Sequence, residues 1–381
     1  MFILLKSGEC YTPESIGKKD ILIAFDKIYK IEDEISKEKL WDTNIIDCTD
    51  KIIIPGLIDQ HVHITGGGGE EGPVSRIPEI QLSEIVSAGV TTLVGVLGFD
   101  SITRNISNLL AKANALQTEG ITSYIYTGSY SIPTSTLTGN VVSDISLVDK
   151  VIGVGEVALA DYRSSHPNLQ MLKELASEAM TGGLIGSKAG IVHIHVGDGK
   201  EGLKLLFRLI EESDFPIDMF IPTHINRNKK LFEQSLEFLD MGGFIDITAG
   251  ESSEKGYSLP DAIEKLIKDN KNLDNVTASS DGNGSNGGNG ICKMSQLFDD
   301  MRDCIIEKKI DITSVLKVST TNVAKFLKIY PQKGTIKDGS DADILILDKE
   351  TLNIDTVIIG GKIFMKNGEI IRKGKFESNI N

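Results

Sequence analysis

Apolar and polar positions follow a repeating cycle between about residue 52 and residue 282. Each cycle begins with a short, β-branched apolar stretch, passes through a polar loop and ends in a segment whose apolar residues recur at helical spacing. The pattern predicts eight strands, at 52–64, 91–98, 121–128, 151–160, 190–197, 219–226, 244–250 and 275–282. Helical spacing follows several of them, as in KLFEQSLEFLDMGG at 230–243, where the final glycines suit a helix stop.

Eight strand–helix units in about 230 residues predict a (β/α)8 barrel. Residues 1–54 and 331–381 differ, because strand-like stretches such as ILIAF and ADILILD alternate there with turn residues. We expect these two ends to join in one small β-domain, with the barrel at 55–330. The segment at 291–329 reads as helical, and we expect its apolar stripe, Met294, Leu297, Phe298 and Met301, to belong to the core.

Candidate metal ligands lie at the ends of the predicted strands. His61 and His63 are two apart on one strand, so both side chains point to the same side and can reach one ion. The full candidate set is His61, His63, Glu156, His195, His224 and Asp281. Imidazole and carboxylate suit zinc, and barrel chemistry gathers at the C-terminal strand ends, so the pattern predicts a two-metal hydrolase. The alternative for any single histidine is that it only packs in the core or lies on the surface. That alternative does not explain why four of the six histidines lie at strand ends.

The composition limits the classes of binding partner and the cellular location that we expect. The formal charge of −14 leaves no basic stripe for a phosphate backbone, which argues against nucleic acid. Four cysteines without a CxxC pair argue against structural disulfides and a zinc ribbon, and favour a reducing cytoplasm. The apolar run at 2–5 is too short for a signal peptide or a membrane span. We therefore expect a cytoplasmic protein with a small-molecule substrate.

Two motifs, PGLIDQHVH at 55–63 and GSDADILILD at 339–348, resemble the amidohydrolase superfamily. TGSYSIP, PTHINRN and SSDGNGS, at 127–133, 222–228 and 279–285, resemble more narrowly its isoaspartyl dipeptidase family, and the similarity extends over nearly the whole chain. The resemblance implies a barrel with a small β-sandwich from the two chain ends. It also implies two divalent metal ions, with zinc expected, a homo-oligomer, and hydrolysis of the β-aspartyl peptide bond in dipeptides by a metal-bridging hydroxide.

The same resemblance assigns roles to the ligands. His61 and His63 would bind the more buried ion, His195 and His224 the more exposed one, and Asp281 would contact the first ion and carry the proton to the leaving amine. Glu156 departs from the family pattern, because many members have a carboxylated lysine there. Glutamate offers the same pair of oxygens on a shorter stem, so we expect a bridge with altered metal spacing or a preference for another divalent ion. The alternative is that Glu156 only pairs with a nearby cation.

Further residues match the family's substrate contacts. Tyr130 would donate to the developing oxyanion, Glu70 would pair with the substrate amine, and Ser285 would add a hydrogen bond. Arg163 and Arg227 would clamp the carboxylates. Each of these residues, taken alone, is also an ordinary surface polar residue. Three further positions follow: Phe99 stands where a small hydroxyl residue is expected, His193 shares a face with His195 and could orient a ligand, and His166 is expected at the surface.

Three alternatives compete with dipeptide hydrolysis. A cyclic-amide hydrolase of the dihydroorotase or hydantoinase type shares the metals and the fold, but Glu70 with two arginines favours a substrate that has a free amine and carboxylates. A deaminase is less favoured, because a carboxylate at the bridging position suggests two metals. A catalytically inactive assembly protein would retain the barrel, but such proteins typically lose metal ligands, and this chain keeps a full set.

Overall fold

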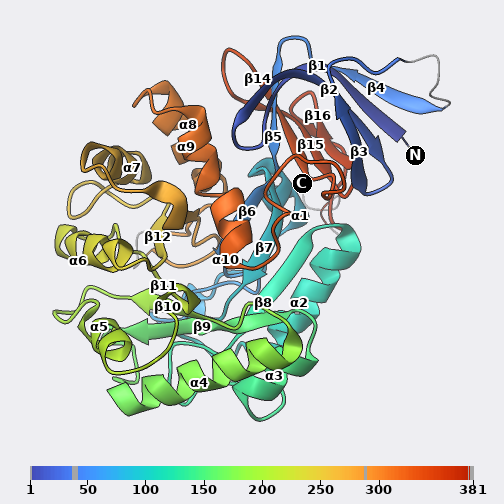
Figure 1. The fold of residues 1–381 in the computed structure, drawn as a ribbon. Helices are drawn as coiled ribbons and strands as arrows, with labels where there is room; N and C mark the ends of the chain where they lie inside the picture. Colours follow the sequence, from blue (N-terminus) through green and yellow to red (C-terminus); the bar gives the residue numbers. More distant parts are fainter. Residues whose placement is uncertain (1, 37–41, 287–289, 376, 378–381) are drawn as a thin grey trace.

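Strands from both ends of the chain share one nine-stranded sheet. A computed structural model describes residues 2–36, 42–286, 290–375 and 377. The sheet order is β17-β16-β15-β14-β5-β1-β2-β3, with β4 beside β1 (Figure 1, upper right). The N-terminal strands are β1 (Phe2–Tyr11), β2 (Ser15–Ala24), β3 (Lys27–Glu32), β4 (Thr43–Asp47) and β5 (Lys51–Pro55). The C-terminal strands are β14 (Ile344–Asp348), β15 (Ile354–Ile359), β16 (Lys362–Lys366) and β17 (Glu369–Ile370). Antiparallel pairing of β5 with β14 joins strands from the two ends of the chain.

The eight predicted barrel strands are all present. They are β6 (Leu57–Val62), β7 (Val90–Gly95), β8 (Thr122–Thr127), β9 (Val151–Leu159), β10 (Ile191–Val196), β11 (Phe220–Thr223), β12 (Ile245–Thr248) and β13 (Val276–Ser279). The first six form a parallel sheet and the last two a parallel pair. The ring closes where the Ile225 amide donates to Asp246 at 3.4 Å and the His63 amide to Gly282 at 2.9 Å. This arrangement confirms the barrel.

Helices cover the outside of the barrel (Figure 1). They are α1 (Leu82–Ser87), α2 (Ile106–Glu119), α3 (Val141–Leu147), α4 (Leu169–Gly186), α5 (Lys204–Glu211), α6 (Lys229–Asp240), α7 (Leu259–Lys268), α8 (Ser295–Ile306), α9 (Ile312–Lys317) and α10 (Thr321–Phe326). Short 3-10 turns are η2 (Pro73–Ser75), η3 (Ile217–Met219) and η4 (Leu273–Asn275). Asn105, Asn168 and Asn228 cap α2, α4 and α6, since each side-chain oxygen accepts from the backbone N–H three residues on. Each such cap is worth about 1 kcal/mol.

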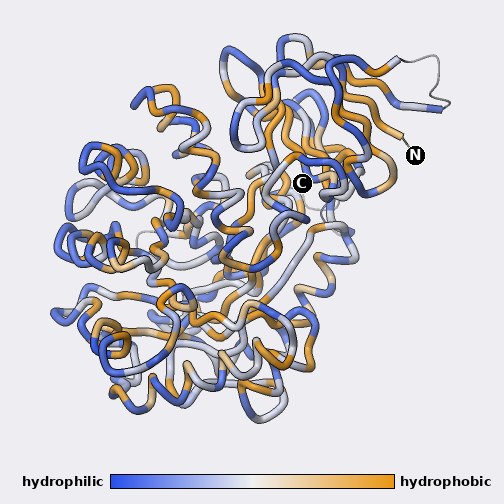
Figure 2. The backbone as a smooth tube through the Cα atoms, viewed as in Figure 1, coloured by the Kyte–Doolittle hydropathy of each residue, from blue (hydrophilic) through white to orange (hydrophobic). Residues whose placement is uncertain are grey.

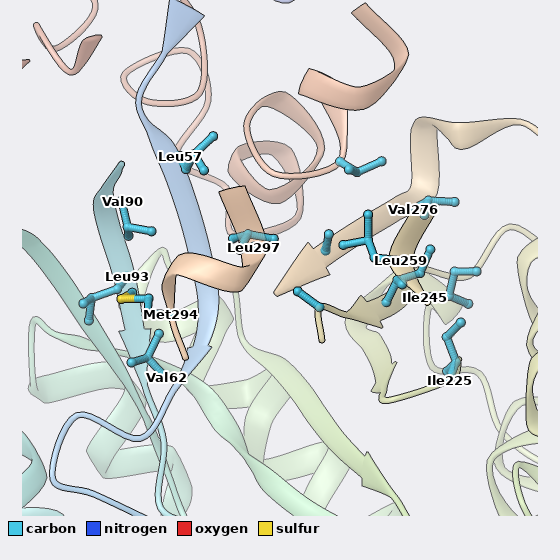
Figure 3. Close-up of a cluster of buried hydrophobic side chains, with 14 of the residues drawn as sticks. Leu57, Val62, Val90, Leu93, Ile225, Ile245, Leu259, Val276, Met294 and Leu297 are labelled. Carbon is cyan, nitrogen blue, oxygen red and sulfur yellow. The ribbon is translucent and has the colours of Figure 1, made fainter. Parts of the chain in front are cut away.

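The main core lies between the barrel strands and the helices. Figure 2 shows hydrophobic and hydrophilic residues alternating along the outer helices. In Figure 3, Met294 and Leu297 lie near Leu57, Val62 and Leu93, and all five belong to one buried cluster. The apolar stripe of α8 is therefore core, as the sequence predicted.

The terminal sheet buries both of its faces. Leu345 and Val357 belong to the same cluster as the barrel core, so one face packs on the barrel. Ile53 and Ile346 belong to a second cluster on the other face. Gly89 fits under β14 with φ +70°, where an added Cβ would lie 2.8 Å from a Leu345 methyl, so a glycine is needed there. Among the described residues, no helix combines the length and apolar character needed to cross a bilayer.

Candidate metal centre and substrate pocket

The barrel strands bring all six predicted ligands together. His61 lies in β6 and His195 in β10, while His63 and His224 directly follow β6 and β11. Asp281 lies two residues beyond β13. His224 and Asp281 have φ of +61° and +51°, so the chain turns sharply just past the two strand ends. Five of the six ligands thus come from the C-terminal edge of the barrel.

Glu156 corrects one expectation, because it lies within β9 and not at its end. The strand continues to Leu159, and pairing with β10 extends through its last residue, which places Glu156 deeper in the barrel. Its carboxylate is at the centre of the cluster. Oε2 lies 3.1 Å from Nδ1 of His195, 3.4 Å from Nε2 of His61 and 3.8 Å from Nε2 of His224, and Oε1 lies 3.4 Å from Nε2 of His63.

Asp281 completes the cluster on one side. Its Oδ1 lies 3.1 Å from Nε2 of His63 and 3.5 Å from Nε2 of His61. On the opposite side, Asp281 accepts a weak hydrogen bond from Sγ of Cys292 to Oδ2, at 3.7 Å. His61 and His63 therefore each face two carboxylates, Glu156 and Asp281.

These side chains fit divalent cations. The ligand atoms of His61, His63 and Glu156 lie within 4.8 Å of one another, and so do those of Glu156, His195 and His224. Within the described chain, His61 Nε2, Glu156 Oε1 and Asp281 Oδ1 are buried without a hydrogen-bond partner. Buried polar atoms are almost always satisfied, so three orphaned ligand atoms in one cluster indicate a site built for cations.

The electrostatics of the cluster also indicate a cation site. Burial opposes a charge on His61, but Glu156 and Asp281 outweigh it and raise its pKa to about 9. Burial also opposes the Glu156 carboxylate, yet His61, His195 and His224 hold its pKa well below the usual range. The pKa of Asp281 is lowered in the same way, against burial, by His63 and His61. Carboxylates that hold a proton on a buried histidine would hold a divalent cation more strongly.

The predicted substrate contacts line the same cavity. Oε1 of Glu70 accepts from Arg163 Nη1 at 3.1 Å and from Ser285 Oγ at 2.9 Å. Tyr130 Oη lies 3.0 Å from Nδ1 of His195. Arg227 lies elsewhere on the wall, where Nε donates to Glu251 Oε1 at 3.2 Å. The structure thus brings all five substrate candidates to one place, with Glu70, Arg163 and Ser285 in one hydrogen-bonded group.

The cavity itself is small and polar. Its volume is about 40 Å³. Gly66 forms part of the wall with φ +83°, and an added Cβ there would lie 1.9 Å from the Ile77 carbonyl oxygen. Phe99 also lines the cavity, with its ring centroid 6.5 Å from that of Tyr130. His166 is exposed, as expected.

Asp161 is a site residue that the sequence analysis missed. Its Oδ2 lies 3.0 Å from Nε2 of His195 and accepts from Arg163 Nη2 at 2.8 Å, while Oδ1 accepts from Arg163 Nε at 3.0 Å. Despite burial, which raises a carboxyl pKa, His195 and Arg163 hold the pKa of Asp161 far below its ordinary value. The available signal was an acid two positions before a candidate arginine on one loop, ADYR at 160–163.

Other side chains orient the imidazole rings. His193 Nε2 lies 2.9 Å from Nδ1 of His61. The ligand that His193 contacts is therefore His61 and not His195, its neighbour in the sequence. Thr248 Oγ1 lies 2.8 Å from Nδ1 of His224. Such contacts fix which ring nitrogen faces the cluster. The threonine contact joins residues 24 positions apart, and no local pattern indicated it.

Below the cluster, Asp246 ties four strands together. Its Oδ1 accepts from Gln60 Nε2 and Thr277 Oγ1, each at 2.7 Å. Its Oδ2 accepts from Thr223 Oγ1 at 2.7 Å and Ser279 Oγ at 2.6 Å. All five side chains are buried. Their hydrogen-bond network therefore fixes the positions of the strands that carry the candidate ligands.

Comparisons with known proteins agree on family and fold. Residues 251–364 match the model of the amidohydrolase family. The structure is similar to the crystal structure of a beta-aspartyl dipeptidase from Fervidobacterium islandicum AW-1, with 43% identity, a TM-score of 0.92, and 97% of this chain and 98% of that chain covered. That dipeptidase is also known in complex with a β-Asp-Leu dipeptide.

More distant similarities, each below 25% identity, also extend over nearly the whole chain. A dihydropyrimidinase from Brevibacillus agri has 15% identity and a TM-score of 0.68, with 98% of this chain and 97% of that chain covered. A 5'-deoxyadenosine deaminase from Methanococcus vannielii is 23% identical over 418 residues, which cover 93% of this chain and 92% of the relative. Proteins with different substrates therefore share this architecture, and the choice among them depends on the residues of the site.

Proposed function

Because this chain belongs to the amidohydrolase family, within which it groups with the beta-aspartyl dipeptidases, we propose that this hydrolase cleaves the β-aspartyl peptide bond of dipeptides with two divalent ions. The observation that carries the proposal is that Glu156 belongs to both candidate ligand groups. One carboxylate between two sets of histidines is the arrangement that a bridged metal pair requires.

We assign His61, His63 and Asp281 to one ion and His195 and His224 to the other, with Glu156 between them. Nitrogen and carboxylate ligands of this kind suit zinc. Bound divalent ions would lower the pKa of water toward neutrality and polarise the scissile carbonyl. No side chain of the protein is then needed as the nucleophile.

Asp281 and Tyr130 would act on the reacting groups. The Asp281 carboxylate, ionised because His63 and His61 oppose its protonation, accepts the proton of the attacking water and passes it to the leaving amine. Burial and Glu156 raise the pKa of Tyr130 well above its usual value, so its hydroxyl stays protonated. A protonated hydroxyl can donate to the developing oxyanion, a contribution of about 3 kcal/mol for donors of this kind.

The charges around the cavity match a β-aspartyl dipeptide. Such a substrate has a free amine, a carboxylate beside it and a second carboxylate on the leaving residue. Glu70 and Arg163, 3.1 Å apart, present a negative and a positive group side by side for the amine and its neighbouring carboxylate. Arg227 remains for the second carboxylate, and both guanidinium groups can bind carboxylates with two hydrogen bonds. A cyclic amide lacks the free amine that Glu70 would bind.

We extend the proposal to the organisation of the protein. Residues 55–330 would form the hydrolase barrel, and residues 1–54 and 331–381 a β-sandwich, which the separate buried cluster around Ile53 and Ile346 supports. Four free cysteines agree with a reducing cytoplasm. A homo-oligomer rests on the family resemblance.

The test offers β-Asp-Leu, α-Asp-Leu and dihydroorotate to purified protein of measured metal content. We expect two divalent ions per chain and cleavage of β-Asp-Leu only. Cleavage of dihydroorotate alone would replace the proposal with a cyclic-amide hydrolase. If zinc-loaded protein cleaves none of the three, a catalytically inactive assembly protein becomes the better account.

A further inference from the structure

Glu70 lies near the tip of a short hairpin formed by residues 66–77, between β6 and α1. We call this segment the Glu70 hairpin. Gly68 and Arg76 form an antiparallel bridge across it. Near its tip, Ser75 Oγ accepts a hydrogen bond at 3.1 Å from the backbone amide of the residue that follows Glu70. Because these contacts hold the hairpin together as one unit, a displacement of its base also displaces the Glu70 carboxylate.

Arg104 connects the two ends of the Glu70 hairpin. It lies in the loop between β7 and α2. Its Nε donates to the Thr65 carbonyl at 3.0 Å, and its Nη2 donates to the Ile77 carbonyl at 2.6 Å. The chain is closely packed here, since an added Cβ on Gly66 would lie 1.9 Å from the same Ile77 oxygen. One planar guanidinium group thus spans the positions at which the hairpin begins and ends.

The Arg104 side chain is buried with a weak partner for its charge. Only 5% of it is exposed, and it lines the substrate cavity. Its one ion pair within the described chain is with Asp100, whose Oδ2 lies 3.5 Å from Nη1. That nitrogen is buried and has no hydrogen-bond partner among the described residues. A buried charge that is paired so weakly costs stability, so a contribution to stability alone does not explain an arginine at this position.

We propose that Arg104 is a positioning residue that fixes the place of Glu70 and thereby the recognition of the substrate amine. This inference rests on the proposed function, in which Glu70 binds that amine. In the part of the chain that the structure describes, Glu70 accepts from Arg163 and Ser285 and not from Arg104. Arg104 therefore acts through the hairpin. Without it, two carbonyls at the base of the hairpin lose their donors, and the tip can move away from Arg163.

The experiment compares β-Asp-Leu with N-succinyl-leucine, which is the same molecule without the α-amine. The quantity measured is the ratio of kcat/KM for the two compounds, which we call the amine ratio. In the wild type we expect a ratio of at least about tenfold, the effect of one hydrogen bond to a charged group. Arg104→Ala should bring the amine ratio close to one with unchanged metal content. Loss of stability, or of a direct contact with the carboxylate that both compounds share, would lower both values of kcat/KM and leave the ratio unchanged.

A double-mutant cycle tests whether Arg104 acts through Glu70. Glu70→Gln alone should reduce the amine ratio as Arg104→Ala does. The double variant should then have the ratio of Glu70→Gln, because two changes to one interaction are not additive. If the two reductions multiply instead, Arg104 acts on the amine independently of Glu70, and the positioning role is overturned.

Two further variants complete the design. Arg104→Lys is the variant to measure if Arg104→Ala does not fold. It keeps the charge but lacks the guanidinium edge that carries both donors, so its amine ratio should still fall below the wild-type value. The matched control is Arg372→Ala, which also removes an arginine that donates to a backbone carbonyl, that of Ile363 at 3.0 Å, but in the terminal sheet. It should leave the amine ratio at the wild-type value.

The outcomes distinguish this inference from the proposed function. A wild-type amine ratio in Arg104→Ala, or in Arg104→Lys where the alanine variant does not fold, overturns the positioning role and leaves dipeptide hydrolysis intact. An equal fall in Arg372→Ala does the same. Equal cleavage of both compounds by the wild type overturns amine recognition by Glu70, and with it the role of Arg104. If the wild type cleaves neither compound, the proposed function fails as well.

Discussion

Replacing Asp161 tests how the second metal group is held. The Asp161 carboxylate lies between His195 and Arg163, with Oδ2 3.0 Å from Nε2 of His195 and both oxygens bound to the guanidinium. The other ring nitrogen, Nδ1, lies 3.1 Å from Glu156. Asp161 therefore fixes which edge of the His195 ring faces the metal cluster, and it is a positioning residue because it acts through His195 and Arg163.

The expected size of the effect follows from these contacts. Loss of a carboxylate behind a ligating histidine typically weakens metal binding by about 10- to 100-fold. For Asp161→Ala, this corresponds to about 1.4–2.7 kcal/mol at the site of His195 and His224. Asp161→Asn keeps one acceptor oxygen and should lose less. Arg163 also loses two of its hydrogen bonds in the alanine variant, so KM should rise together with the loss of metal.

The assay is competition with a chromophoric chelator, which reports the affinity of each ion without reference to activity. Asp161→Ala should weaken one of the two ions and leave the other near its wild-type affinity. Asp198→Asn is the matched control, because Asp198 is an exposed aspartate that accepts from Asn228 at 3.0 Å, away from the ligands. Wild-type affinity for both ions in Asp161→Ala would refute the positioning role.

Four other predictions test separate parts of the site and the fold. Glu156→Ala should reduce bound metal from two ions per chain toward none by elemental analysis, and full retention of both ions would exclude the bridge. Tyr130→Phe should lower kcat by about 10²- to 10³-fold with little change in metal content, and an unchanged kcat would remove its oxyanion role. Asp246→Ala removes the shared acceptor of four buried donors and should lower the free energy of unfolding in urea by about 3–5 kcal/mol, whereas a loss below about 1 kcal/mol would contradict the network's importance. Hydrogen bonds from Lys308 and Ser253 lower the pKa of Asp261 to about 2, so this group stabilises the fold fully above its unfolded pKa of about 3.9 and loses that effect as pH falls toward 2. Asp261→Asn should therefore lower the free energy of unfolding at about pH 7 by at most about 1 kcal/mol, since the pair is partly exposed, and the difference from wild type should shrink near pH 3; a constant difference would contradict this linkage.

Local patterns were sufficient for the strands and for the candidate ligands. Short, β-branched apolar stretches followed by helical spacing mark the eight barrel strands. His61 and His63 are recognisable because strand geometry alone places them on one side. Contacts between distant loops could not be predicted in this way. The partner of His224 is Thr248 and that of Arg227 is Glu251, each 24 positions away, and only the packing of neighbouring strands brings them together.

The position of Glu156 along its strand changes what its shorter side chain implies for the metal site. From the sequence, a glutamate in place of a longer carboxylated lysine predicts a widened or shifted site, if its backbone stands at the strand end. Its backbone instead lies inside β9, and from that depth its two oxygens lie within 3.8 Å of nitrogens of all four candidate histidines. The deeper backbone position of Glu156 thus compensates for its shorter side chain. Separation of the ions in the metal-loaded protein, measured crystallographically, should then fall in the usual range of about 3.5–4 Å for two-metal hydrolases, and a clearly longer separation would show that the stem length still governs the site.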